Sequence, residues 1–344
     1  MKSVATAVGV SLSTVSNAYN KPEQLSADVR ERIFAAAREL GYPGPDAAAR
    51  TLRSRRAGAI GLLLTEQLSY AFSDPFAVGL LAGLAEVAER TRTGLLLIPL
   101  PRYDISTDAD ALRESVETVR SAVVDGVAAY CVDVGHPALD VIASRGLPFA
   151  HSDDEVPGRR VVIDEVGATR AVGEHLARLG HTSVAMVVDA GRSRNVPGEI
   201  TDESVLYTNA RLRAQGLREG LGKDARVTLV TGGHNAVESG LAAAEFVLDR
   251  RDRPTAIAAG GDVLAFGVIE AVRRRGLVPG RDVSVTGFDD IPAAEAAGLT
   301  TVRQPIRDKG RTLGHMLLDP SYTKERVVLP TELVIRSSTG PVRN

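Results

Sequence analysis

Short polar side chains are concentrated in one stretch near the start of the chain, SLSTVSNAYN. It carries hydroxyl groups or carboxamides at Ser11, Ser13, Thr14, Ser16, Asn17 and Asn20. Such groups form hydrogen bonds with phosphate oxygens and with the edges of bases. In a helix of this sequence Val15 and Ala18 fall on the side opposite the polar groups. The stretch therefore predicts an amphipathic helix that presents a hydrogen-bonding face.

The elements around this stretch predict a small helical domain over residues 1–44. Helices are expected over residues 2–7, 12–19 and 26–40, with Gly9 in a turn and Ser11 capping the second helix. Ala5, Gly9 and Val15 occupy the positions where a helix-turn-helix needs a small contact, a tight turn and a core anchor. The second helix would enter a major groove, where Leu12 is placed to touch a thymine methyl group. The alternative is a capping bundle in which the hydroxyl groups only cap helices.

The next segment, residues 45–56, is expected to be a hinge. Its sequence DAAARTLR is too short for a stable isolated helix, so it is expected to fold on DNA. Ala49 is small enough for two copies to pack closely, Leu52 can wedge between base pairs, and Arg50 and Arg53 can hold phosphates. A flexible basic linker is the alternative.

Charge is divided unevenly along the 344 residues. From Met1 to Arg56 there are nine basic and five acidic side chains, a net charge of +4, whereas the whole chain carries −2. The remainder therefore carries −6, and this division is typical of a protein that holds phosphates with one end. No apolar stretch is long enough to span a membrane and the chain contains one cysteine, Cys131, so we expect a cytoplasmic protein.

The rest of the chain alternates short apolar runs with helical stretches. Strands are expected within residues 57–64, 93–100, 125–132, 146–152, 182–188, 226–230, 255–260 and 282–288. This alternation predicts an α/β fold of two doubly wound parallel-sheet lobes with a ligand cleft between them. The glycines of GLLAGLAEV lie inside a predicted helix and are interpreted as packing positions. No phosphate-binding loop, zinc motif or nucleophile elbow occurs, so we expect no catalytic residue, no metal and no cofactor.

Several motifs in order resemble the lac repressor and galactose repressor family of bacterial transcription regulators. They include VGVSLSTVSNAYN, ELGYPGPDAAARTLR, DPFAVGLLAGL and VTGFDDIP, and the resemblance spans essentially the whole chain. It implies a periplasmic-binding-protein-like body over residues 57–344. One lobe would hold about 57–160 and 291–318, and the other about 161–290 and 319–344.

Candidate effector contacts follow the ends of the predicted strands. Pro75 and Phe76 follow the first strand, Asp153 follows the fourth, and Asp262 and Asp289 follow two later strands. The family resemblance implies contacts from an aromatic near Phe76, from Arg213 and from Asp289. A forked donor, paired acceptors and an apolar face suit polyols and sugars. For each acid alone, a helix cap or a loop salt bridge is an open alternative.

Two departures from the family pattern affect the expected site. Gly261 stands where many members have Asn, which removes a side-chain donor. The polar stretch 190–204 is long for a connector and is interpreted either as a lid at the pocket edge or as a surface excursion.

The resemblance implies a repressor that binds a pseudo-palindromic operator as a homodimer and is switched by a small sugar-like effector. No leucine heptad for tetramer formation follows at the C-terminus. The rival hypothesis is a cytoplasmic solute-binding or sugar-processing α/β protein whose N-terminal helices serve only for association.

Overall fold

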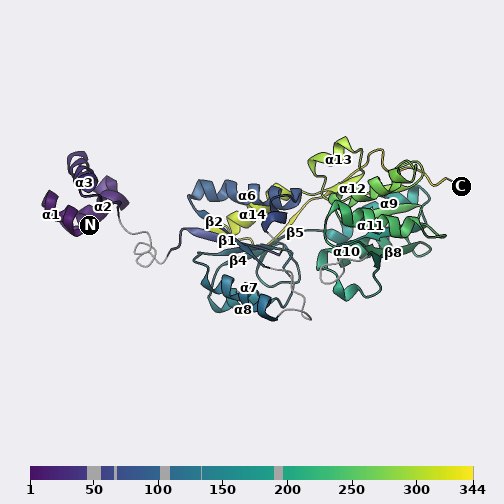
Figure 1. Cartoon of the computed structure of the whole chain (residues 1–344), viewed down its shortest axis with the longest axis horizontal. Coiled ribbons are helices and arrows are strands. Elements are labelled where there is room, and N and C mark those ends of the chain that lie inside the picture. The colour runs from purple at the N-terminus through teal and green to yellow at the C-terminus, as the bar shows by residue number, and fades with distance from the viewer. Residues whose placement is uncertain (45–55, 66–67, 101–108, 133, 190–196, 344) are drawn as a thin grey trace. The chain divides into compact units, whose positions relative to one another are not determined.

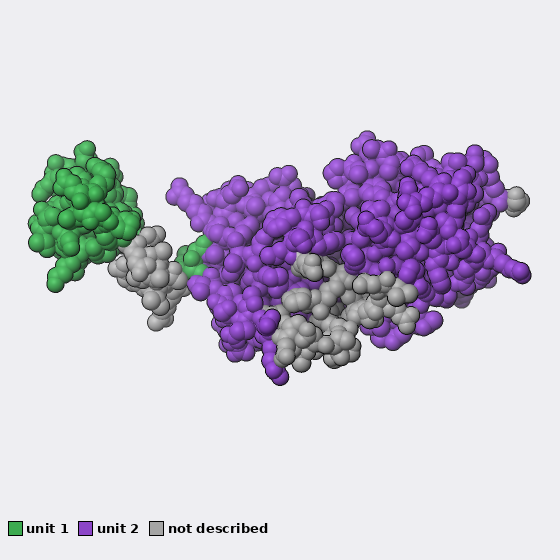
Figure 2. All heavy atoms as spheres, in the orientation of Figure 1, with its two compact units in different colours: residues 1–58 green, residues 59–344 purple. Residues whose placement is uncertain are grey.

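The computed structural model describes residues 1–44, 56–65, 68–100, 109–132, 134–189 and 197–343. These form two compact units, the head (residues 1–58) and the body (residues 59–344), coloured separately in Figure 2. Most of the expected hinge, including Ala49, Arg50, Leu52 and Arg53, lies outside the described residues. Its proposed role stays a prediction.

The head contains the three predicted helices. They are α1 (Lys2–Val8), α2 (Leu12–Asn20) and α3 (Ala27–Glu39), with a 3-10 turn η1 (Pro22–Gln24) before the third. Gly9 ends α1 in the left-handed region, at a φ of 72°, where a residue without a Cβ is least strained. Six fully or nearly buried side chains form the centre of the small core: Val4, Ala5, Val15, Ala18, Ile33 and Ala37. The helix predictions for this region are confirmed.

The first lobe of the body is built on six parallel strands in the order β12-β5-β4-β3-β1-β2. The strands are β1 (Ala59–Leu64), β2 (Gly94–Pro99), β3 (Val127–Tyr130), β4 (Phe149–His151), β5 (Arg159–Ile163) and β12 (Arg326–Leu329). Helices α6 (Pro75–Thr91) and α14 (Ile306–Leu318) cover one face and α7 (Ala109–Ser121) and α8 (Pro137–Ser144) the other (Figure 1). The short α5 (Leu68–Ala71) follows β1.

Helices α6 and α14 meet backbone to backbone. A Cβ at Gly83 would lie 1.9 Å from the carbonyl oxygen of Arg307, and one at Gly310 would lie 2.1 Å from that of Leu80. Any side chain at these positions would separate the helices, since real Cβ contacts are never this short. The interpretation of the GLLAGLAEV glycines as packing positions is confirmed at Gly83.

The second lobe is built on a five-stranded sheet in the order β10-β9-β6-β8-β7. Its strands are β6 (Ser183–Val187), β7 (Gly198–Glu199), β8 (Arg226–Thr231), β9 (Ala256–Ala259) and β10 (Ser284–Thr286), and β7 alone among them pairs antiparallel. The hydrophobic core on one face includes α9 (Glu165–Arg178) and α10 (Thr208–Leu221), and that on the other includes α11 (Val237–Leu248) and α12 (Asp262–Arg274). Each of the eight predicted strands is present, and the predicted α/β class with a helical N-terminal domain is confirmed.

The lobe boundaries differ from those expected. We assigned residues 291–318 to the first lobe, but Ala294 of α13 (Pro292–Ala296) and Val302 of β11 (Thr301–Arg303) pack into the cores of the second. We assigned residues 319–344 to the second lobe, but β12 pairs in parallel with β5 in the first. The chain returns to the second lobe only at β13 (Glu332–Val334), which pairs with β11.

The chain therefore crosses between the lobes three times. The crossings lie at residues 163–165, 303–306 and 329–332. The first lies within a few residues of the expected boundary at about 160–161, whereas the second and third lie more than ten residues beyond those expected. These two were misplaced because β11 and β12 are short strands with charged residues, which periodicity does not distinguish from loops. In the described part of the chain, no helix is long and apolar enough to cross a membrane.

Candidate functional site

The polar stretch of the head forms the exposed helix α2. The Ser11 hydroxyl caps it by accepting a hydrogen bond from the Thr14 N–H at 3.0 Å. Val15 is fully buried, whereas Leu12 is half exposed, and Ser11, Ser13 and Asn20 are exposed. Thr14, Ser16 and Asn17 are partly exposed. The predicted division of this helix into a buried and a polar side is confirmed.

The polar groups of α2 bind one another or neighbouring turns. Asn20 donates to the Ser16 carbonyl oxygen at 3.0 Å, and Asn17 donates to the carboxamide of Gln24 at 3.3 Å. These are exposed hydrogen bonds of side chains near the helix surface, and each is readily exchanged for a bond to another acceptor. The helix thus offers donors and acceptors whose rearrangement costs little.

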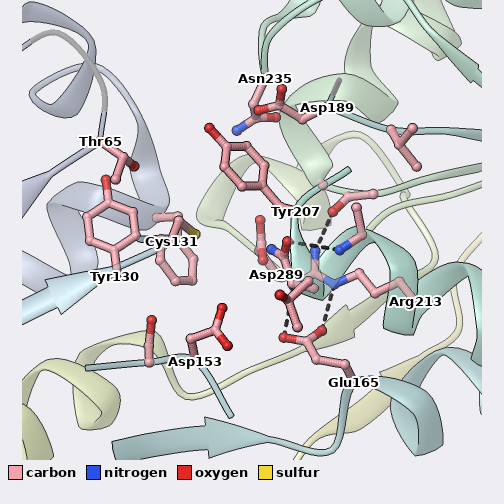
Figure 3. Close-up of a pocket in the computed structure, with 18 of the residues that line it drawn as sticks. Thr65, Tyr130, Cys131, Asp153, Glu165, Asp189, Tyr207, Arg213, Asn235 and Asp289 are labelled. Atoms are coloured by element: carbon pink, nitrogen blue, oxygen red, sulfur yellow. Dashed lines mark hydrogen bonds and ion pairs between the residues drawn. The ribbon is translucent and has the colours of Figure 1, made fainter. Parts of the chain in front are cut away.

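The body encloses a pocket of about 150 Å³ between its two lobes (Figure 3). It opens at the carboxyl ends of the strands, as parallel α/β sheets favour. Its polar lining residues are Thr65, Tyr70, Asp74, Tyr130, Cys131, Ser152, Asp153, Glu165, Asp189, Tyr207, Thr208, Asn209, Arg213, Asn235, Asp289, Gln304 and Lys309. The lining side chains are buried or half-buried.

Arg213 of α10 anchors the second-lobe side of this pocket. Its Nε donates to Glu165 at 2.6 Å, its guanidinium also donates to the Gly260 carbonyl, and its Cζ lies 3.6 Å from the centre of the Phe288 ring (Figure 3). Burial opposes the charge, yet the adjacent Glu165 carboxylate raises the pKa of Arg213 above its usual value. The side chain is thereby fixed in orientation by an ion pair and an aromatic face.

A chain of hydrogen bonds links the second crossing to the first lobe. Lys309 of α14 donates to the carboxamide oxygen of Gln304 at 3.0 Å, and the carboxamide nitrogen of Gln304 donates to Asp289 at 2.6 Å. Asp289 adopts a φ of 116°, which an L-residue rarely takes and which requires the surroundings to hold it. Burial raises the pKa of Asp289 well above its usual value, with Arg213 opposing this, and burial lowers the pKa of Lys309.

Tyr70 and Asn235 join the two lobes at the pocket. The Tyr70 hydroxyl donates to the Asn235 backbone carbonyl at 2.8 Å and accepts from the Asn235 carboxamide at 2.9 Å. Tyr70 belongs to α5 of the first lobe, and Asn235 follows β8 of the second. This pair of hydrogen bonds links the two lobes directly.

Four of the six candidate effector residues line the pocket: Phe76, Asp153, Arg213 and Asp289. Pro75 and Asp262 are not among the lining residues, which is a correction. Pro75 is the first residue of α6, and Asp74, its cap, lines the pocket instead. Asp262 is fully buried and accepts from the Ile291 N–H at 2.9 Å and the Thr301 hydroxyl at 2.6 Å, so its carboxylate holds these two segments of the second lobe together.

Gly261 lines the pocket as expected from its place before α12. The carboxamide oxygen of Asn235 lies 3.4 Å from where a Cβ at Gly261 would be. A side chain amide therefore lies beside the position where the family pattern has Asn, but it comes from another segment. In the stretch 190–204, residues 190–196 lie outside the described part, and β7 beyond them pairs with β8.

Sequence reasoning missed several lining residues, among them Asp189, Tyr130 and Asn235. Asp189 comes just after β6, and Tyr130 ends β3, so the rule that ligands bind beyond the carboxyl ends of strands identifies both. Asn235, Gln304 and Lys309 lie on connections or on a returning helix, and only the fold brings them to the pocket. Within the described residues, no cluster of histidine, cysteine and carboxylate side chains is arranged to hold a metal ion.

Comparisons with known proteins agree with this division of the chain. Residues 1–44 match the model of bacterial regulatory proteins, lacI family, and residues 173–339 match the periplasmic binding protein-like domain. An HTH-type transcriptional regulator of Mycolicibacterium smegmatis is 41% identical over 99% of this chain and 96% of its own length.

Two solved structures extend the comparison. The lac repressor dimer bound to operator and the anti-inducer ONPF is 25% identical with a TM-score of 0.77, covering 98% of each chain. The complex of the transcriptional regulator CelR with cellobiose is 25% identical with a TM-score of 0.68, again over 98% of each chain.

Proposed function

Because the chain belongs to the lacI family of bacterial regulatory proteins and is a DNA-binding transcriptional regulator, we propose that it acts in the cytoplasm as an effector-controlled repressor of carbohydrate-related genes. The observation that carries the proposal is the combination of an exposed polar helix in the head with a polar pocket between the lobes of the body. The first suits a DNA groove and the second suits a small polar ligand.

Helix α2 is the proposed recognition helix. Ser11 is assigned to a phosphate next to the helix N-terminus. The residues assigned to base edges and other phosphates are Leu12, Ser13, Thr14, Ser16, Asn17 and Asn20. Asn17 has the right chemistry for adenine and Leu12 for a thymine methyl group. When the hinge folds on DNA, four more residues are proposed to contact it, namely Ala49, Arg50, Leu52 and Arg53.

A homodimer is the proposed binding form. Two recognition helices related by a two-fold axis read two half-sites, so the operator is expected to be pseudo-palindromic. The lac repressor, which this chain resembles over nearly its whole length, was solved as a dimer on its operator.

The pocket is the proposed effector site, with Phe76, Asp153, Arg213 and Asp289 among its contacts. CelR, a structural relative, was solved with cellobiose, which supports a sugar-like effector here. A ligand that favours one lobe arrangement changes the affinity of the protein for its operator, typically about 5- to 150-fold. Operator binding changes the affinity for the ligand by the same factor. The rival hypothesis, a solute-binding or sugar-processing α/β protein whose N-terminal helices serve only for association, does not fit full-length relatives that are transcriptional regulators.

Operator binding tests the proposal directly. Duplexes selected from a random library by the full-length protein are titrated by fluorescence anisotropy at several salt concentrations. We expect affinity to fall steeply with salt, because phosphate contacts release counterions. The double variant Ser13→Ala/Asn17→Ala should bind at least tenfold more weakly, since contacts of this kind contribute about 1–3 kcal/mol each.

Ser3→Ala is the matched control, because Ser3 is an exposed hydroxyl residue on α1 of the same head. It should bind like the original protein. Equal affinities for the double variant and the control would contradict the assignment of α2 to DNA. Selection of no duplex at all would contradict the operator-binding proposal.

A further inference from the structure

The pocket holds more acidic than basic side chains. Five residues with carboxyl groups line it, namely Asp74, Asp153, Glu165, Asp189 and Asp289, against two cationic residues, Arg213 and Lys309. They come from both lobes, and Figure 3 labels Asp153, Glu165, Asp189, Asp289 and Arg213 around the cavity. Burial raises the pKa of Asp74 and of Asp289, so the pocket disfavours negative charge even on its own side chains. A ligand that enters brings its own charge into a partly desolvated space, where charges interact more strongly than in water.

Both cations of the pocket are engaged by groups of the protein. The guanidinium of Arg213 is engaged by Glu165, by the Gly260 carbonyl and by the face of Phe288. The ammonium of Lys309 donates to Gln304 and lies 5.5 Å from the centre of the Phe76 ring. A phosphate or carboxylate ligand would have to compete with Glu165 for Arg213, and Lys309 would have to turn from Gln304 toward it.

The pocket also contains acceptor atoms that lack donors. Asp74 is 6% exposed, and its Oδ2 accepts from the Ala77 N–H at 3.1 Å while its Oδ1 has no hydrogen-bond partner. The Oδ1 of Asn235 is likewise buried without a partner, while the carboxamide nitrogen of Asn235 donates to the Tyr70 hydroxyl. A buried acceptor without a donor costs about 1–3 kcal/mol, so a ligand that supplies donors gains affinity there.

We propose that this pocket takes an uncharged polyhydroxyl ligand and rejects phosphorylated or acidic sugars, with Asp74 and Asn235 accepting ligand hydroxyls from opposite lobes. Hydroxyl groups supply the missing donors and add no negative charge beside the carboxylates. The inference rests on the proposed function in that it takes this pocket to be the effector site. It goes further by naming the charge of the effector and two residues that select it.

Matched pairs of compounds test the charge selection. Isothermal titration of the full-length protein compares ribose with ribose 5-phosphate, glucose with glucuronate, and cellobiose with cellobionate. We expect at least one neutral member to bind and its anionic counterpart to bind roughly tenfold more weakly or worse. An anionic member that binds as tightly as its neutral counterpart would overturn the inference.

The absence of binding by every neutral compound would also count against the inference, because it names hydroxyl compounds as ligands. Operator binding measured on the same preparation separates a failure of the ligand assignment from a failure of the regulator assignment. If the protein binds DNA but none of these compounds, the regulator assignment stands and the ligand assignment fails.

Variants test the two acceptors. Asp74→Ser keeps a residue that caps α6 but removes the unpartnered oxygen, so the neutral ligand should bind roughly tenfold more weakly. Asp164→Ser is the matched control, because Asp164 caps α9 in the same way, by accepting from Gly167, but does not line the pocket. Unchanged ligand affinity in Asp74→Ser would contradict the role of Asp74.

Asn235 needs a control for its contact with Tyr70. Asn235→Leu removes the carboxamide acceptor and the carboxamide bond to the Tyr70 hydroxyl, whereas Tyr70→Phe removes both hydrogen bonds of that hydroxyl and keeps the acceptor. We expect Asn235→Leu to weaken the neutral ligand at least fivefold more than Tyr70→Phe does. Equal losses would show that Asn235 acts through the contact between the lobes and not on the ligand.

Discussion

In the head, the polar side chains proposed to meet DNA come from one helix of nine residues and remain exposed or half-exposed. In the body, the polar side chains of the pocket come from many segments and two lobes, and they are buried or half-buried. The head therefore separates its binding surface from its core, whereas the body builds its binding surface into its fold. Apart from the helix cap Ser11, changes to binding residues are expected to leave stability intact in the head but not in the body.

The largest expected effect tests whether the head folds independently of the body. Ile33 is fully buried in the head's core, so Ile33→Ala should cost about 4 kcal/mol of head stability, a large fraction for so small a unit. DNA binding should be lost, while ligand affinity and the unfolding of the body stay unchanged. Leu40→Ala, a change at a side chain 51% exposed in the same head, is the control. Loss of ligand binding in Ile33→Ala would show that the units are not independent.

Acid should affect the body rather than the head, which contains no histidine. Burial lowers the pKa of His151 from 6.5 to about 4, and burial also lowers the pKa values of His175 and His181. The unfolded chain then binds protons that the folded body does not, so stability is lost as pH falls from about 6.5 toward 4. For His151 alone the loss is roughly 3 kcal/mol.

Urea unfolding followed by circular dichroism at pH 7 and pH 4.5 measures this effect. His151→Gln should lose less stability between the two pH values than the original protein does. If both proteins lose the same amount, His151 is not the group that titrates.

The smallest expected effect separates capping from DNA contact within one residue. Ser11→Ala should cost about 1 kcal/mol of head stability, because the N–H of Thr14 loses its acceptor. Ser11→Asp restores a cap but places a negative charge against phosphates. We expect it to recover thermal stability while operator affinity falls further. Operator affinity that rises with recovered stability would mean that Ser11 serves only as a cap.

The head was predictable from sequence because its signals are local. Each signal acts within a few residues of the chain. The signals are the helix caps Ser11 and Ser26, the turn at Gly9, and the helical spacing of Val15 and Ala18. The parallel strands were predictable for a similar reason, since each buried strand is a continuous apolar run.

The pocket was only partly predictable because it depends on long-range contacts. Phe76, Asp153 and Asp289 follow strands and were identified, but Asp262 follows a strand too and its carboxylate binds Ile291 and Thr301 instead. Position after a strand does not say which way a side chain turns. Lys309 and Gln304 reach the pocket only because the chain crosses between lobes at residues 303–306, a crossing that has no local signal.

Cys131, the one cysteine of the chain, lies just after β3 and lines the pocket. Burial raises its pKa to about 12, so at neutral pH it is held as a thiol that reacts slowly with aromatic disulfide reagents. Contact with solvent restores the reactivity of an ordinary cysteine. We expect the labelling rate of the unmodified protein to report how accessible this pocket is, and a bound effector that fills the pocket should lower the rate.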